Sequence, residues 1–255
     1  MPKTNFSNSR KIQVAQSMFW ANNLKCISGK NFAELERELS SSPIEKKDCG
    51  GYKQPYAYSK YAAGSRIPTR PSESKDSPIT KAEEKYWRSA TAYNSIFWDL
   101  LSSANQDIDI SKYLARIPNN IRIRLKLIGV DLAERNSINF KDEDFAKLVL
   151  IKDIDILGLM ILQIKAHKHD IDYGHIYFIR NWILIASQNF EPFRICKNII
   201  FEVIEENLPE IGFLNGIDGI DTDKIHSERA RDSFIAAFLS GKSLTLKSPY
   251  QSIFN

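Results

Sequence analysis

Apolar residues recur at steps of three and four along most of the chain, which is the spacing of one buried helix face. The first such run covers residues 12–27 and stops before Gly29, a residue type that favours helix ends. Asn31 then precedes a shorter run over residues 32–39, with Glu34 three positions after it, as in a capping box. The sequence therefore predicts two consecutive helices near its beginning.

A third helix is predicted after a long polar break. Residues 40–51 are rich in serine, glycine and charge and predict a loop. Residues 55–63 then carry proline in the first turn and end before Gly64, which is the usual asymmetry of helix ends. The front of the chain thus holds three short helical segments.

Three prolines, Pro68, Pro71 and Pro78, with several serines between them, predict a linker of low helical potential. We therefore place a domain boundary there. The expected domains are residues 1–78, a basic module with its linker, and residues 79–255, a helical domain for dimerisation or partner binding.

The second domain alternates helical runs with short polar breaks. The runs cover residues 80–101, 110–114, 121–128, 142–167, 173–187, 192–207 and 223–239. No strict two-residue alternation persists long enough to indicate a sheet, although residues 177–185 are β-branched and aromatic enough to suit either structure. The fold class predicted for the whole chain is mainly α.

The composition of the chain indicates the cellular environment in which it folds. With 255 residues, 43% of them hydrophobic, the chain can bury a substantial core. Its three cysteines are far apart and odd in number, which indicates a reducing compartment rather than a disulfide framework. The polar start lacks the apolar stretch of a secretory signal, and the most apolar region, residues 148–164, is interrupted by charges. We expect a cytoplasmic protein with no membrane association.

Charge is distributed unevenly. The net charge is +4, but residues 1–90 hold 16 Lys+Arg against 9 Asp+Glu, a balance of +7. The remainder has 19 bases and 22 acids, a balance of −3. A contact with a polyanion is therefore expected at the front of the molecule.

The front also contains the phrase Tyr58-x-x-Tyr61-x-x-Gly64-x-Arg66-x-Pro68. This phrase resembles the end of the recognition helix and the following turn in Cro/C1-type (XRE-like) helix-turn-helix repressors. The resemblance covers about residues 20–71. The chain differs from such repressors in that about a dozen residues separate its second and third helical segments, a length that a surface loop tolerates because loop-closure entropy grows slowly.

The resemblance implies a sequence-specific DNA-binding regulator of bacterial, plasmid or phage origin. On that basis the residues facing the major groove would be Gln54, Tyr56, Tyr58, Ser59 and Lys60. Lys60, Arg66 and Arg70 would lie near phosphates, where cations displace counterions and supply most non-specific affinity. The expected partner is double-stranded DNA, bound by a homodimer whose interface comes from the apolar segments 145–164 and 176–185.

Two other interpretations stay open. Tyr56, Tyr58 and Tyr61 could instead pack on Trp20 and Phe32 as core residues. The basic face could then meet an acidic protein surface, which would make the chain a helical interaction factor or inhibitor from a mobile element or phage, without enzymatic activity.

A metal-dependent phosphodiesterase is the remaining alternative. It would use the cluster His167, His169, Asp170 and His175. However, a spacing of two residues directs His167 and His169 to different sides of a helix, and no His-Glu-x-x-His motif accompanies them. We therefore expect a polar connection between helices there, with no catalytic residues, no metal and no cofactor.

Overall fold

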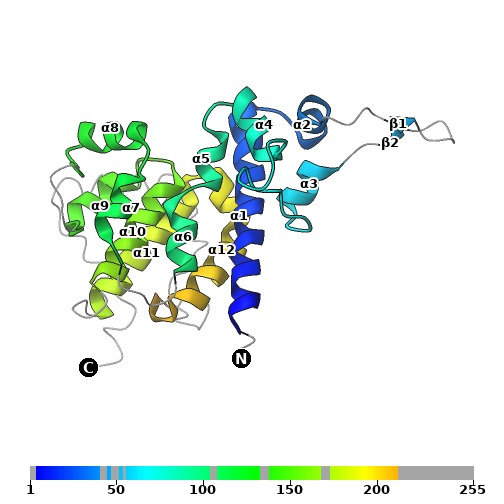
Figure 1. The fold of residues 1–255 in the computed structure, drawn as a ribbon. Coiled ribbons are helices and arrows are strands. Elements are labelled where there is room, and N and C mark those ends of the chain that lie inside the picture. Colours follow the sequence, from blue (N-terminus) through cyan, green and yellow to red (C-terminus); the bar gives the residue numbers. More distant parts are fainter. Residues whose placement is uncertain are drawn as a thin grey trace.

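The structure, a computed structural model, describes residues 4–40, 45–46, 52–53, 56–103, 108–132, 138–167 and 173–211 (Figure 1). Its helices are α1 (Thr4–Ser28), α2 (Phe32–Leu39), α3 (Ala57–Ala62), α4 (Pro78–Lys85), α5 (Ser89–Tyr93), α6 (Ile96–Ser102), α7 (Ile110–Ala115), α8 (Asn119–Leu127), α9 (Asp142–Leu148), α10 (Ile154–Ala166), α11 (Tyr173–Asn189), α12 (Glu191–Asn207) and the 3-10 helix η1 (Pro209–Ile211). The chain is mainly helical, as predicted. The helix predicted for residues 223–239 lies outside the described residues.

The front of the chain forms the three predicted helices. Gly29 follows α1 with a φ of +67°, in the left-handed region that ends helices. The capping box of α2 is formed: the Glu34 amide donates to the Asn31 side chain at 3.0 Å, and the Asn31 amide donates to the Glu34 carboxylate at 2.8 Å. The segment predicted as a loop contains β1 (Glu45–Lys46), which pairs antiparallel with β2 (Tyr52–Lys53).

Two long helical runs are divided in the structure. Residues 80–101 form α4, α5 and α6, and residues 142–167 form α9 and α10. Ser95 and Asp153 stand before α6 and α10, and each side chain accepts a hydrogen bond from an amide inside its helix. The apolar spacing continues across these breaks because each successive helix buries an apolar face, although α4 and α6 bury theirs in different hydrophobic clusters. The ambiguous residues 177–185 are helical, within α11.

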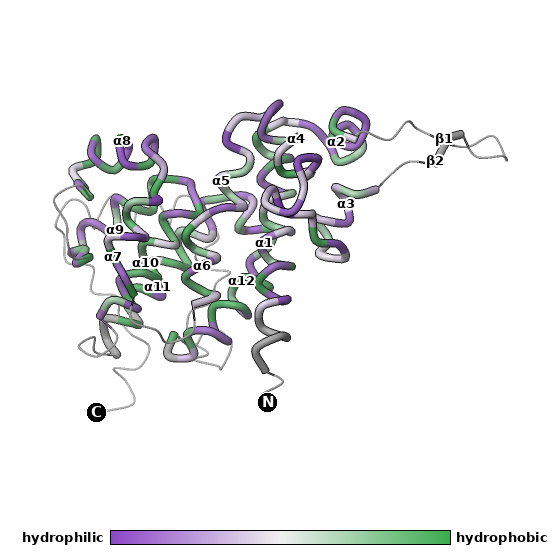
Figure 2. The backbone as a smooth tube through the Cα atoms, viewed as in Figure 1, coloured by the Kyte–Doolittle hydropathy of each residue, from purple (hydrophilic) through white to green (hydrophobic). Residues whose placement is uncertain are grey.

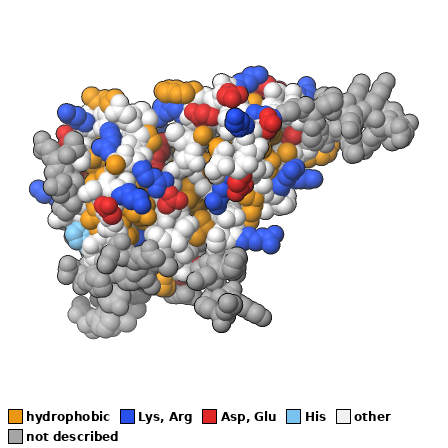
Figure 3. All heavy atoms as spheres, viewed as in Figure 1, with side chains coloured by type: hydrophobic (Ala, Val, Ile, Leu, Met, Phe, Trp, Pro, Cys, Tyr) orange, Lys and Arg blue, Asp and Glu red, His pale blue; other side chains and the backbone are white. Residues whose placement is uncertain are grey.

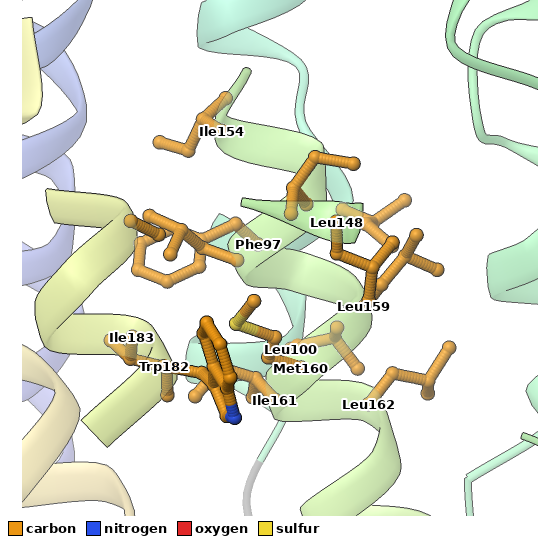
Figure 4. Packing of buried hydrophobic residues seen from close by; sticks show 14 of the residues in the cluster. Phe97, Leu100, Leu148, Ile154, Leu159, Met160, Ile161, Leu162, Trp182 and Ile183 are labelled. Atoms are coloured by element: carbon orange, nitrogen blue, oxygen red, sulfur yellow. The ribbon is translucent and has the colours of Figure 1, made fainter. Parts of the chain in front are cut away.

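The larger of two hydrophobic clusters surrounds α10, which is apolar along its length (Figure 2). Side chains of α6 and α11, including Phe97 and Trp182, close around Met160 and Ile161 (Figure 4). Every residue from Ile154 to Ile164 is buried. A helix that is buried on all sides has no polar face. Its sequence therefore does not show which side of the helix faces the core.

The smaller cluster joins α1 to α2, α3, α4 and α5. Its buried residues are Trp20, Ala21, Leu24, Leu35, Leu39, Tyr58, Tyr61, Ile79, Ala82 and Tyr93. Ile79, Ala82 and Tyr93 follow residue 78, so the expected domain boundary does not coincide with the division between the clusters. Helix α1 belongs to both clusters, since Phe19 lies in the larger one and Trp20 in the smaller.

Most apolar side chains of the expected dimer interface are buried in the described part of the chain. Within segments 145–164 and 176–185, residues such as Phe145, Leu159 and Ile183 are fully buried in the larger cluster. These apolar side chains pack against one another inside a single chain, because α9, α10 and α11 face a common interior. The two segments therefore supply most of their apolar side chains to the core of one chain, and the homodimer stays a prediction.

The turn after α3 packs directly on α1. Gly64 has a φ of +70°, and a Cβ atom placed there would lie 2.8 Å from both Met18 Sδ and Val14 Cγ1. Glycine is thus required twice, once for its backbone conformation and once for the close approach of the two segments.

A buried polar contact joins the beginnings of α6 and α10. The Asp155 carboxylate accepts the Ser95 hydroxyl at 2.6 Å and the Ile96 amide at 3.2 Å. Burial, with a smaller contribution from the nearby Asp153 carboxylate, raises the pKa of Asp155 to about 7. The negative charge at this position therefore opposes folding at neutral pH.

Replacing Gly64 with alanine is expected to lower the free energy of unfolding by about 2–4 kcal/mol, combining left-handed strain with overpacking. The Gly29→Ala variant is the matched control, because Gly29 has a similar φ but nothing within 4 Å of the added Cβ. It should lose only about 1 kcal/mol. Urea unfolding of the two variants measures the difference, and equal losses would contradict the packing described for Gly64.

The raised pKa of Asp155 predicts that stability falls as pH rises from about 4 to about 7, since the folded state holds the proton that the unfolded state releases. Each pKa unit corresponds to about 1.4 kcal/mol. Asp155→Asn keeps the acceptor oxygen and removes the charge, so its stability should vary less over this range and exceed that of the parent at pH 8. Thermal melts at several pH values measure this, with the exposed Asp76→Asn as control. A parent profile that stays flat from pH 4 to 7 would contradict the prediction.

Candidate nucleic-acid interface

Helix α3, the predicted recognition helix, is held by aromatic packing. The Trp20 ring lies 6.0 Å from the Tyr58 ring and 5.9 Å from the Tyr61 ring, measured between centroids. Tyr58 and Tyr61 are each only 3% exposed. The expectation that Tyr58 faces the major groove is therefore wrong, because its side chain fills the space against Trp20 instead. The alternative that these two tyrosines are core residues is the one that the structure adopts.

Glu36 on α2 fixes the start of α3. Its carboxylate accepts the Tyr58 amide at 2.9 Å, and the side chain is almost fully buried. Burial raises the pKa of Glu36, while the Tyr58 and Ala57 amides act in the opposite direction. This contact satisfies an amide of the first turn of α3 that has no partner within the helix.

The outward side of α3 carries the remaining candidate residues, and we name Tyr56, Ser59, Lys60 and Arg66 the α3 corner. Tyr56 is 59% exposed, Lys60 and Arg66 are exposed, and Ser59 is half-buried. The Lys60 carbonyl accepts the Ser65 amide at 3.0 Å and the Arg66 amide at 3.3 Å. The backbone therefore holds the two cationic residues next to each other at the end of the helix.

Side-chain contacts keep the α3 corner in place. The Arg66 guanidinium lies 5.8 Å from the centre of the Tyr61 ring, a cation–π distance. The Ser59 hydroxyl donates to the Tyr56 carbonyl at 3.0 Å, which leaves its oxygen able to accept. The α3 corner thus presents two cations, a phenol and a hydroxyl from an anchored turn.

The charge around the α3 corner has one sign over a long stretch of sequence. Residues 49–72 contain Lys53, Lys60, Arg66 and Arg70 and no aspartate or glutamate. The carboxylate of Glu36 lies close enough to Arg66 and Lys60 for both cations to lower its pKa, but it is buried under α3. An anion approaching from solvent therefore meets the cations first.

The other expected contacts are not gathered at the α3 corner. Arg70 is exposed, but it lines a separate cavity of about 350 Å³ with Tyr93, Gln16 and the Arg116–Asp99 ion pair. Gln54 lies outside the described residues. On the face shown in Figure 3, Lys and Arg side chains are interspersed with Asp and Glu rather than gathered in one broad area. Any anion contact at the α3 corner is therefore local.

A second cavity, of about 390 Å³, brings together residues that the sequence did not connect. Trp87, Arg88, Arg124 and Lys152 line it, from the turn after α4, from α8 and from the segment before α10. The only signal in the sequence was Trp87, which stands outside the apolar rhythm of its segment. The cations are dispersed in sequence, and only folding places them around one cavity.

The histidine cluster is only partly described. A His167 ring nitrogen lies 2.5 Å from the Ile138 carbonyl oxygen. His169 and Asp170 lie outside the described residues, as does the side chain of His175. Across the residues that the structure describes, no three His, Cys, Asp or Glu side chains are placed to hold a metal ion. In the same part of the chain, no helix combines the length and apolar character needed to cross a membrane.

Replacing Glu36 with alanine is expected to lower the free energy of unfolding by about 1–3 kcal/mol, since the buried Tyr58 amide loses its acceptor. Glu36→Gln keeps an acceptor oxygen without a charge to desolvate and should be as stable as the parent or more so. Urea unfolding and hydrogen exchange at the Tyr58 amide measure both effects. Equal stability of the alanine and glutamine variants would contradict this role.

No protein-family model, curated protein or solved structure matches this chain. The similarity to Cro/C1-type repressors therefore stays a prediction based on the phrase around Gly64. Any function assigned to the chain has to come from the surfaces it presents, of which the α3 corner is the one that the sequence anticipated.

Proposed function

We propose that this protein binds double-stranded DNA through the α3 corner and acts as a DNA-binding regulator. The main observation behind the proposal is that the Arg66 amide donates to the Lys60 carbonyl, which places the two cationic residues together at the end of α3. The smaller hydrophobic cluster holds this helix in place. Because the backbone of the two residues is already ordered, little backbone entropy would be lost when their side chains contact phosphates.

The residue types at the α3 corner suit a phosphate backbone. Arginine offers a planar fork of donors and lysine a mobile ammonium, and both displace condensed counterions. The Tyr56 hydroxyl can donate to a phosphate oxygen, and the Ser59 oxygen, whose proton goes to the Tyr56 carbonyl, can accept from a base edge. Tyr58 has no part in this proposal, because it is buried.

The packing of α2 and α3 supports the proposal. They are successive helices, joined through Glu36 and packed on a common aromatic cluster. They differ from a helix-turn-helix pair in that β1 and β2 lie between them in place of a tight turn. In this arrangement α3 would approach the groove and α2 would support it from behind. β1 and β2 lie farther out on the side of the molecule that holds α2 and α3 (Figure 1).

A second candidate function is binding of a protein partner, and α8 favours it. Ile123 is 53% exposed and Leu127 is 81% exposed, and their spacing of four residues places them on one face of the helix. Exposed apolar residues at this spacing are the anchors of helix-in-groove recognition. This surface lies apart in sequence from the α3 corner, so the two functions are separable by substitution.

The test is fluorescence anisotropy with a labelled mixed-sequence duplex over a range of salt concentrations. We expect the Lys60→Gln, Arg66→Gln double variant to bind about tenfold or more weakly at low salt. The slope of log K against log salt should fall by about 2, since two phosphate contacts are lost. Lys112→Gln on α7, which removes an exposed lysine elsewhere, should leave both quantities unchanged.

A double variant with the parent's affinity and slope would overturn the α3 corner as the DNA site. Absence of any duplex affinity in the parent protein at low salt would overturn DNA binding altogether. In that case α8 becomes the surface that the structure favours.

A further inference from the structure

The cavity of about 390 Å³ is built by segments distant in sequence. The turn after α4 supplies Trp87 and Arg88, α8 supplies Arg124, and the residues before α10 supply Lys152 and Asp153. Its volume is within the range of small-molecule sites, which is about 300–1,000 Å³. It lies outside the α3 corner and shares no residue with it.

The charges of the cavity favour an anion. Arg88, Arg124 and Lys152 line the cavity together with one carboxylate residue, Asp153. Burial raises the pKa of Asp153, whereas Arg88 and Arg124 lie close enough to lower it. Among the described residues, none of the three cations forms an ion pair. Asp153 is occupied as the cap of α10, where its carboxylate accepts the Asp155 amide at 3.0 Å. The cavity therefore keeps an excess of two positive charges.

The aromatic side chain at the cavity is exposed in a way that core packing does not explain. Trp87 is 76% exposed, and the Arg88 guanidinium lies 5.3 Å from the centre of its ring. An exposed indole beside cations is the usual arrangement for stacking a nucleobase next to its phosphate. Ile27 and Phe190 add apolar surface to the same cavity.

The backbone holds Arg88 in an unfavourable conformation. The Ser89 amide donates to the Tyr86 carbonyl at 3.0 Å, which closes a turn with Trp87 and Arg88 in the centre. Arg88 has a φ of +71°, the only positive value of a residue other than glycine in the described part of the chain. Glu83 stabilises the turn by accepting the Arg88 amide at 2.7 Å and the Ala90 amide at 2.6 Å. The surrounding hydrogen bonds thus hold an arginine in a conformation that favours glycine, as is common at functional sites.

We infer that this cavity binds a nucleotide, with its phosphate on Arg88, Arg124 and Lys152 and its base stacked on Trp87. The nucleotide could be free or could be the phosphorylated end of a single strand, since both present one phosphate beside one base. This inference does not depend on DNA binding by the α3 corner.

Tryptophan fluorescence tests the site directly. The chain has four tryptophans, and Trp20, Trp98 and Trp182 are buried, so Trp87 is the one that a ligand in solvent can stack on. Adenosine 5′-monophosphate should quench the emission at lower concentration than adenosine or inorganic phosphate, by about tenfold or more. A 5′-phosphorylated oligonucleotide that quenches at lower concentration than the mononucleotide would assign the site to a strand end, and the reverse order to a free nucleotide.

Variants separate the cavity from general folding. Arg124→Gln with Lys152→Gln should weaken binding of adenosine 5′-monophosphate, measured by calorimetry, by about tenfold or more. Arg88→Gly removes a guanidinium while suiting the left-handed backbone, so it should weaken binding with an unchanged or higher melting temperature. The Lys60→Gln, Arg66→Gln double variant should bind the nucleotide as the parent does, which distinguishes this inference from the proposed function.

Three results would overturn the inference. One is the absence of quenching by any of these ligands in the parent protein. Another is equal affinity for inorganic phosphate and adenosine 5′-monophosphate, which would remove the role of Trp87. The third is an unchanged affinity for adenosine 5′-monophosphate in two variants, the double variant Arg124→Gln, Lys152→Gln and the single variant Arg88→Gly, provided that both melt as folded proteins.

Discussion

Helix α1 is buried on both sides, and the rest of the molecule depends on this packing. Phe19 meets Trp98, Phe190 and Phe193 at centroid distances of 5.9, 5.6 and 6.5 Å, whereas the adjacent Trp20 meets Tyr58, Tyr61 and Tyr93. Neighbouring residues on a helix point about 100° apart, so two consecutive aromatic rings can enter two different clusters. Lys11 near the start of α1 pairs with Glu202 and Glu206 of α12, which adds a polar contact to the same assembly.

This packing decides which front residues reach solvent. Because Tyr58 and Tyr61 pack against Trp20, α3 packs on α1 and its polar side faces outward. Tyr58, which the resemblance placed in the major groove, is part of the core, whereas Tyr56, Lys60 and Arg66 lie at the surface. The α3 corner is therefore a consequence of how the smaller cluster fills its volume.

The two cationic surfaces of the molecule differ in kind. The α3 corner is exposed and formed by one segment, which suits contacts with a polymer of phosphates. The cavity at Trp87 is concave and is formed by the turn after α4, by α8 and by the approach to α10, which suits a small anion that several cations surround. A modest net charge of +4 is compatible with both, because each surface depends on a local excess of cations over carboxylates.

The sequence by itself determined the helical class and the local ends of helices. The spacing of apolar residues fixed α1 and α2, and Gly29, Asn31 and Glu34 fixed the ends between them, because these effects act within a few residues. It also located the cationic segment that became the α3 corner. Tertiary structure alone decided that Tyr58 is buried, that the apolar face of α10 is enclosed within one chain, and that Arg88, Arg124 and Lys152 share a cavity. These outcomes depend on which distant segments pack together in the interior. Local sequence patterns do not specify that packing.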